Sequence, residues 1–88
     1  MLRISASEAA EEQMILKLDG QVTGQWVKLL QATCEAHLNN SLRVIIDLKN
    51  VSFADREGIA LLRSLTDRQV EFLNALPFIA EQIGRATP

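Results

Sequence analysis

The chain has 88 residues, of which 48% are hydrophobic and 23% are charged, and its net charge is −2. This composition is typical of a small globular protein, so we expect residues 1–88 to form a single domain with one modest core. Acidic and basic residues are interspersed, which argues against the basic face of a nucleic-acid-binding protein and against a polybasic patch for anionic lipid.

Two strands are predicted before the first helix. Residues 1–7 alternate apolar and polar side chains weakly, and residues 8–13 predict a polar, acidic turn. Met14–Leu18 alternates more clearly and predicts a better strand, which Gly20 ends because glycine tolerates the positive φ of turns. We expect the two strands to pair antiparallel.

A helix is predicted from Thr23, whose hydroxyl would cap the first turn, to about residue 40. Apolar residues recur at spacings of three and four, so one stripe of this helix faces a core. The stripe comprises Val27, Leu30, Cys34 and Leu38, with Trp26 and Leu29 widening it. Cys34 is therefore expected in the core, whereas Trp26 fits the core edge and an interface equally well.

Leu42–Leu48 is predicted to be the central strand. Its middle residues are apolar on both faces, a pattern typical of a strand inside a sheet. After a turn at residues 49–50, we expect Val51 and Phe53 to point inward. Further helices are predicted over residues 56–67 and between Pro77 and Gly84, with a short strand over Val70–Asn74 between them.

The predicted order of elements is β-β-α-β-α-β-α. Strands joined through helices usually lie parallel with right-handed crossovers, whereas the first two strands can form a hairpin. The sequence therefore predicts an α/β domain in which a mixed four-stranded sheet carries about three packed helices.

Several features favour the cytoplasm. The one cysteine, Cys34, has no partner for an internal disulfide, which fits a reducing compartment. The first residues lack the apolar core of a signal peptide, and no apolar run approaches the roughly 18 residues of a membrane span. We therefore expect a cytoplasmic protein without direct membrane insertion.

The sequence offers little support for catalysis or a cofactor. His37 is the one histidine, and no nucleophile or carboxylate is expected on its face of the helix. Cysteine and histidine clusters that bind zinc are absent, as is a phosphate-binding loop. Gly20 and Gly24 are interpreted as a tight turn rather than an anion cradle. We therefore expect a non-enzymatic protein with no metal and no cofactor.

The turn from Ser52 to Gly58 is the remaining candidate site. Asp55 is well placed to cap the following helix, and Glu57 lies in its first turn, where the helix dipole favours acidic residues. Both acids therefore have a structural explanation. The same helix start also exposes unpaired N–H groups, where a partner, an anion or a phosphate can act.

At these residues the chain resembles the STAS family, the domain shared by anti-sigma factor antagonists and sulfate transporter tails. The family pattern is an apolar strand ending in Asp-Leu, followed by F-x-D-S-S-G and an apolar helix. Here Ile45–Leu48 is followed by Phe53–Gly58, which reads FADREG, and then by an apolar helix. The upstream segment Leu16–Thr23 also resembles the strand, glycine and turn of the family.

In bacterial regulators of this family, a partner kinase phosphorylates the second serine of D-S-S-G, which releases the partner. Asp55 and Gly58 match the pattern, whereas Arg56 and Glu57 stand where the two serines would be. Glutamate has no hydroxyl, and its charge only partly imitates phosphoserine. The resemblance therefore implies a domain without the usual switch, which either binds its partner constitutively or is held by Glu57 in a permanent phospho-like state.

The leading hypothesis is a protein-binding module of STAS type in a bacterial regulatory system. Its partner would be an anti-sigma factor or a related serine-kinase-like ATPase domain. The expected partner-binding residues are Ser52, Asp55, Arg56, Glu57, Gly58, Arg63 and Asp67. The alternative is a STAS subunit that docks on the ATPase of an ABC-type lipid transport system. Pairing with a second copy of the chain and modification of Ser52 or Ser64 both stay open.

Overall fold

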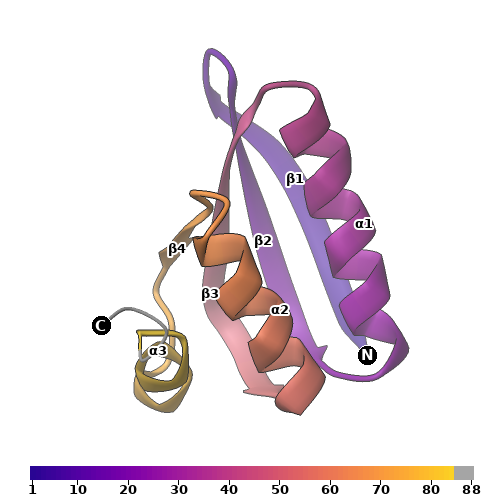
Figure 1. Cartoon of the computed structure of the whole chain (residues 1–88), viewed down its shortest axis with the longest axis vertical. Coiled ribbons are helices and arrows are strands. Elements are labelled where there is room, and N and C mark those ends of the chain that lie inside the picture. Colours follow the sequence, from indigo (N-terminus) through magenta and orange to yellow (C-terminus); the bar gives the residue numbers. More distant parts are fainter. Residues whose placement is uncertain (85–88) are drawn as a thin grey trace.

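The computed structural model describes residues 1–84. Its elements are β1 (Leu2–Ala10), β2 (Gln13–Val22), α1 (Gln25–Asn39), β3 (Arg43–Ala54), α2 (Arg56–Thr66), β4 (Glu71–Leu73) and α3 (Pro77–Gly84). Figure 1 shows these elements along the chain. The predicted order β-β-α-β-α-β-α and the α/β class are both confirmed.

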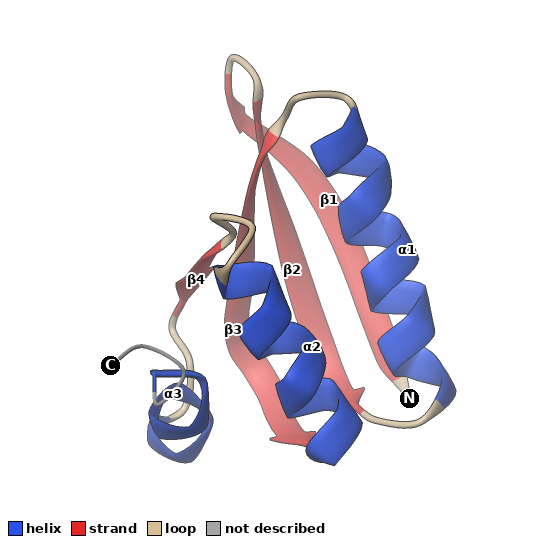
Figure 2. Cartoon of the chain, viewed as in Figure 1, coloured by secondary structure: helices blue, strands red, loops and turns tan. Residues whose placement is uncertain are grey.

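The four strands form one mixed sheet in the order β1-β2-β3-β4. β1 and β2 pair antiparallel, whereas β2 with β3 and β3 with β4 pair parallel. Both crossovers step across the sheet in the same direction, and right-handed crossovers of this kind place their helices on the same face. Accordingly, α1 and α2 cover one face of the sheet in Figure 2.

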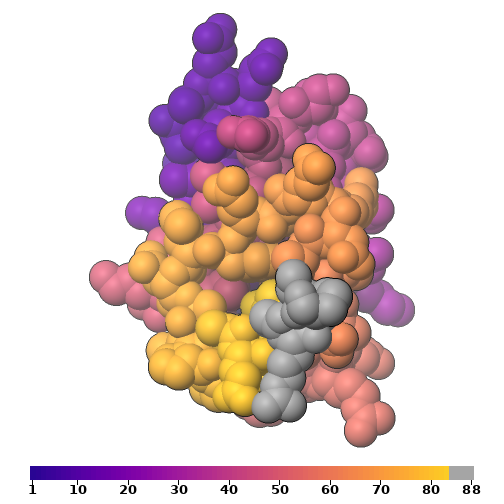
Figure 3. Space-filling view, turned by 60° about the vertical axis from the view of Figure 1, so that its left-hand side comes forward, coloured from indigo at the N-terminus to yellow at the C-terminus, as the bar shows by residue number. Residues whose placement is uncertain are grey.

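The core lies between this face of the sheet and the helices. Alternate residues of β2 and β3 point into it, as the period of two along a strand requires. Its largest fully buried side chains are those of Leu16, Leu18, Leu30, Ile46, Leu48, Leu62, Leu65 and Ile79. The last of these comes from α3, and Figure 3 looks onto the side where α3 lies next to the segment that contains β4.

The predicted stripe of α1 is largely confirmed. Val27, Leu30 and Cys34 belong to the hydrophobic core. Trp26 and Leu38 are partly buried and pack against that core. Leu29 is the exception, because its side chain is 45% exposed. It lies two residues after Val27, which turns it about 200° round the helix and onto the solvent side.

The first hairpin differs from the prediction. Residues 8–13 were expected to form a turn, but β1 continues to Ala10 and β2 begins at Gln13, so the turn contains only Glu11 and Glu12. The polar side chains of residues 8–10 do not prevent strand pairing here, because β1 is an edge strand whose side chains can stay in solvent. At its other end β2 runs through Gly20, where φ is 122°, to Val22 instead of ending at the glycine.

β3 also differs, because it passes through residues 49–50 without a turn and continues to Ala54. The pairing of β2 with β3 contains two register shifts of the kind that a β-bulge produces, each with one extra residue in β3. In the second shift, Gly20 pairs with Val51 and Gln21 with Phe53, so that Ser52 is unpaired. Val51 is buried as expected, but the expectation for Phe53 is wrong, because its side chain is 48% exposed. The extra residue at the register shift breaks the strict alternation on which that expectation rests.

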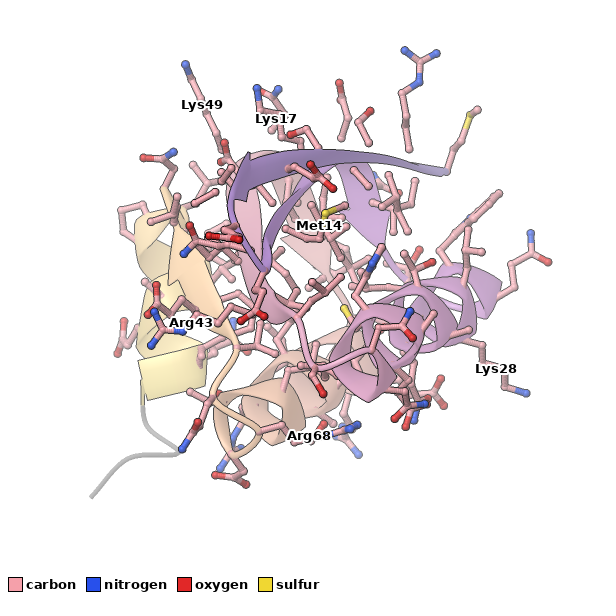
Figure 4. The ribbon with its side chains drawn as sticks, turned by 90° about the horizontal axis from the view of Figure 1, so that it is seen from above. Met14, Lys17, Lys28, Arg43, Lys49 and Arg68 are labelled. Atoms are coloured by element: carbon pink, nitrogen blue, oxygen red, sulfur yellow. The ribbon has the colours of Figure 1, made fainter. Side chains whose placement is uncertain are left out.

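Along residues 1–84, none of the helices combines the length and the apolar character that crossing a membrane would require. The uncovered face of the sheet is partly polar, and Figure 4 shows Lys17 and Lys49 pointing away from the helices on that side. Asp47 on β3 accepts hydrogen bonds there from the Lys49 backbone N–H at 2.9 Å and from Asn74 Nδ2 at 3.2 Å. These hydrogen bonds, that of Lys49 foremost, lower the pKa of Asp47.

Candidate functional site

The candidate site lies where β2 and β3 end and the following helices begin. These strands are parallel, so both strand-to-helix junctions meet at one edge of the sheet. Asp55 joins them: its Oδ1 accepts the Gly58 N–H at 2.7 Å, and its Oδ2 accepts the Gly24 N–H at 3.0 Å. The predicted role of Asp55 as N-cap of α2 is confirmed, and the same carboxylate also holds the start of α1.

These hydrogen bonds determine the ionisation of Asp55. The N–H groups of Gly58 and Gly24, in that order, lower the pKa of its carboxyl group, because donated hydrogen bonds stabilise the charged form. The side chain therefore carries its negative charge at neutral pH, next to the positive ends of two helix dipoles.

The prediction that Thr23 caps α1 is wrong. The N-cap is Gly24, with φ of 52° and ψ of −128°, and no side-chain hydrogen bond caps the helix. Glycine adopts this left-handed φ at little cost, and in this conformation its N–H donates to the carboxylate of Asp55. The start of α1 is thus tied to the neighbouring junction through the N–H of its N-cap residue.

Gly58 allows α2 to approach the end of β2. A Cβ at this buried position would collide with the carbonyl oxygen of Val22, and it would lie 3.2 Å from Val22 Cγ1 and 3.3 Å from Ala54 Cβ. The same Val22 carbonyl accepts the N–H of Asp55 at 3.2 Å. The spacing D-x-x-G therefore has a packing reason: Asp55 closes the junction, and only glycine fits three residues later.

Arg56 and Glu57 lie between these two anchors, and both are exposed. Among residues 1–84 neither side chain takes part in a hydrogen bond or a salt bridge, and the salt bridge found there joins Arg68 to Glu35 at 3.2 Å. The exposed guanidinium and carboxylate are therefore available to a partner. Their backbone is fixed on both sides by Asp55 and Gly58.

The other predicted binding residues divide into two groups. Arg63 is exposed on α2 about two turns beyond Arg56, on the same side of the helix. Ser52 is exposed at the bulge of β3, where its Oγ donates to the Gly20 carbonyl at 3.4 Å. Asp67 is the C-cap of α2, roughly 16 Å along the helix axis from Arg56, so the structure does not bring it to the turn.

An open groove of about 590 Å³ lies next to the turn, between α2 and α3. Two exposed phenylalanines contribute to it: Phe53 from the end of β3 and Phe78 from α3. Sequence reasoning missed this feature, because it placed Phe53 inside and gave Phe78 no role. The periodicity of α3 was the available signal, since burying Ile79 and Ile83 leaves Phe78 exposed on a neighbouring side.

Two other groups with potential chemistry, Cys34 and His37, lie on α1. Cys34 lies in the core as predicted, and burial raises the pKa of its thiol to about 11. His37 lies in the last turn of α1, where its backbone carbonyl accepts the N–H of Asn40 at 3.1 Å. In the stretch 1–84, no group of histidine, cysteine, aspartate and glutamate side chains could hold a metal ion.

Comparison with known proteins bears on the fold. No protein-family model matches the sequence, and no curated protein matches it significantly. A solved structure of the anti-sigma factor antagonist SpoIIAA in its unphosphorylated form is similar, with a TM-score of 0.69 and 18% sequence identity over 90% of this chain and 79% of that chain. The fold expected from the STAS resemblance is confirmed: the chain has a SpoIIAA-like arrangement of a mixed four-stranded sheet and three helices.

Proposed function

We propose that residues 1–88 form one non-enzymatic protein-binding domain of STAS type that acts in the bacterial cytoplasm. Its partner is an anti-sigma factor or a related serine-kinase-like ATPase domain, and it binds through the turn at residues 52–58 and the exposed side of α2. The observation that carries this proposal is the exposed pair of Arg56 and Glu57, fixed between Asp55 and Gly58 at a helix start.

The rigid backbone of this turn supports a binding role. The hydrogen bonds of Asp55 tie it to both helices, and the close contact at Gly58 holds it against β2. Surface groups whose backbone is already ordered lose less conformational entropy when they bind. Arg56 can pair with a carboxylate through two parallel hydrogen bonds, and Glu57 with a basic side chain.

We also propose that binding is constitutive. Glu57 occupies the position of the phosphorylated serine in the family pattern, and it has no hydroxyl to accept a phosphate. Its single charge is smaller than that of phosphoserine, about −1.5 to −2, and the neighbouring Arg56 offsets it. The nearby hydroxyl of Ser64 donates to the Leu61 carbonyl at 2.8 Å and lies about two turns along α2, away from that position.

Affinity capture from the native cells tests this function. Three baits are compared: the wild-type chain, Glu57→Ala and Glu11→Ala. Glu11 is a matched control, because it is a glutamate in the β1–β2 turn, at the opposite end of the sheet. We expect the wild type and Glu11→Ala to retain one partner that Glu57→Ala loses. Equal retention by all three chains would refute the proposed surface, whereas a partner gained by Glu57→Ala would establish the permanent phospho-like state instead.

The identity of the captured protein distinguishes the two partner classes. An anti-sigma factor or kinase-like domain supports the regulatory function, and an ABC ATPase subunit supports the transport alternative. Intact-mass measurement after incubation with the purified partner and ATP then tests the missing switch. We expect no added phosphate; stoichiometric phosphate on Ser52 or Ser64 would show that the domain is switched by phosphorylation after all.

A further inference from the structure

We propose that the groove between α2 and α3 docks a segment of the partner that carries apolar side chains flanked by carboxylates. This inference rests on the proposed function, because the groove shares Arg56 with the binding turn. It adds α3 to the binding surface and specifies the chemistry of the segment that binds there.

The apolar part of the groove comes from three elements. Ile59 and Ala60 on α2 line it between Phe53 at the end of β3 and Phe78 on α3. The two phenylalanine side chains are 48% and 43% exposed, which is a large apolar surface for a domain of this size. Rigid aromatic side chains of this kind often dominate the energy of binding at protein interfaces.

The charged part of the groove comes from Arg56 and Arg63. Both line it, and neither guanidinium makes a hydrogen bond or salt bridge within residues 1–84. The carboxylate in the lining, Asp55, already uses both oxygens on backbone N–H groups. The groove thus offers two unpaired positive charges on a chain whose net charge is −2, so it favours an acidic segment over a basic one.

The spacing of the arginines defines the complementary segment further. They are about two helical turns apart, or roughly 10 Å along α2, and the apolar floor lies between them. Carboxylates separated by the same roughly 10 Å on one side of a helix occur at positions i and i+7. An extended strand does not provide this spacing on one face, because its side chains alternate between the two faces. A helical segment of this kind would present the apolar side chains between its carboxylates to the two phenylalanines.

A second copy of the chain is a less suitable occupant. Its exposed acidic segment is the turn region Glu8–Glu12. The residues between the glutamates of this segment are Ala9 and Ala10. Alanine methyl groups offer little apolar surface to the space between two phenylalanines. The negative charge of this segment suits the groove, but its alanine side chains are too small to fill the apolar part.

Selection from a peptide library tests the proposal. A random library of peptides of about 12 residues, roughly three helical turns, is selected in parallel on the whole wild-type chain and on Arg56→Glu/Arg63→Glu. We expect the wild type to enrich aspartate or glutamate on either side of leucine or aromatic residues. The variant should keep the apolar residues and replace the acids by lysine or arginine. The same peptides on both chains, or no acidic enrichment on the wild type, would overturn the proposal.

A second measurement locates the peptide on the chain. Titration of the labelled chain with one selected peptide should shift the amide NMR signals of Ala60, Arg63 and Phe78. Phe78→Ala should weaken binding at least about tenfold, as expected for an aromatic hot spot, whereas Leu29→Ala, an equally exposed apolar residue on α1, should not. Shifts centred elsewhere, or equal effects of the two substitutions, would contradict docking in the groove.

The outcomes separate this inference from the proposed function. If Phe78→Ala retains the captured partner and Glu57→Ala loses it, the groove proposal fails and the turn remains the binding site. If both substitutions leave capture unchanged, both proposals fail. Sedimentation of the chain alone gives the remaining outcome, since self-association abolished by Arg63→Glu would identify a second copy as the occupant and overturn the proposal.

Discussion

Asp55 is the residue on which the geometry of the turn at residues 52–58 depends. Its two carboxylate oxygens accept N–H groups from residues that begin different helices, Gly58 at 2.7 Å and Gly24 at 3.0 Å. An ionised carboxylate accepts both hydrogen bonds at once, and each is strengthened by its charge. The charge of Asp55 therefore helps to hold the two strand-to-helix junctions together.

Because these hydrogen bonds lower the pKa of Asp55, its contribution to stability depends on pH. The contribution is complete above the pKa of the unfolded chain, about 3.9, and is lost as the pH falls through the lower pKa of the folded state. We expect Asp55→Asn to lower the urea midpoint at neutral pH, and this difference from the wild type to shrink below about pH 4.

Comparing the two chains at each pH isolates Asp55 from Asp47, whose pKa is lowered as well. Asparagine suits the comparison because it is also a good N-cap but has one acceptor oxygen in place of two and cannot change its charge. Urea unfolding followed by circular dichroism measures the midpoints. A difference that is the same at neutral and acidic pH would contradict the role given to the charge of Asp55.

At the scale of residues, the local part of the site was predictable and the long-range part was not. Asp55 three residues before Gly58 indicates an N-cap because both groups belong to the same turn. Its hydrogen bond to Gly24 joins residues that are 31 positions apart, so no local pattern reveals it. Thr23 is a good capping residue by type, but α1 begins one residue later, with Gly24 as its N-cap.

At the scale of elements, the close approach of α2 to β2 depends on Gly58. Alanine in place of a helical glycine stabilises by up to about 1 kcal/mol on propensity alone. Here the added Cβ would collide with the Val22 carbonyl, so we expect Gly58→Ala to destabilise the fold by about 1–3 kcal/mol, as overpacking does. Helix propensity and packing thus predict opposite changes in the free energy of unfolding, so this substitution distinguishes between them.

Urea unfolding at neutral pH measures the free energy of unfolding of Gly58→Ala. Ser64→Ala on the exposed side of the same helix is the matched control, since it raises helix propensity without introducing a clash. A Gly58→Ala chain as stable as the wild type would show that α2 can move away from β2 without cost. The packing explanation of the D-x-x-G spacing would then be wrong.

The groove illustrates what element-level patterns leave out. Alternation along β3 predicts Phe53 on the same side as Val51, but the unpaired Ser52 between them breaks that alternation, and Phe53 is exposed. Such a bulge depends on the register between β3 and β2, which lie far apart in the sequence. The bounds of α3 were predicted correctly from Pro77 and Gly84. Its position beside α2 could be seen only in the tertiary structure.

At the scale of the whole molecule, the fold was predictable because its determinants are coarse. The apolar periodicities, the short connections and the handedness of crossovers together restrict the sheet to a few topologies. The result is SpoIIAA-like at 18% identity, so most side chains differ while the arrangement of strands and helices is retained. The similarity concerns the fold alone, which is why the proposed binding surface needs a test of its own.

The most direct test of the binding surface is a titration of the isotope-labelled chain with its purified partner, followed by amide NMR shifts. We expect the largest changes to fall within residues 52–63 of the turn and α2. Residues of the uncovered face of the sheet, such as Lys17 and Asp47, should change little. Changes centred on that face, with the signals of Arg56 and Glu57 unaffected, would contradict the central claim.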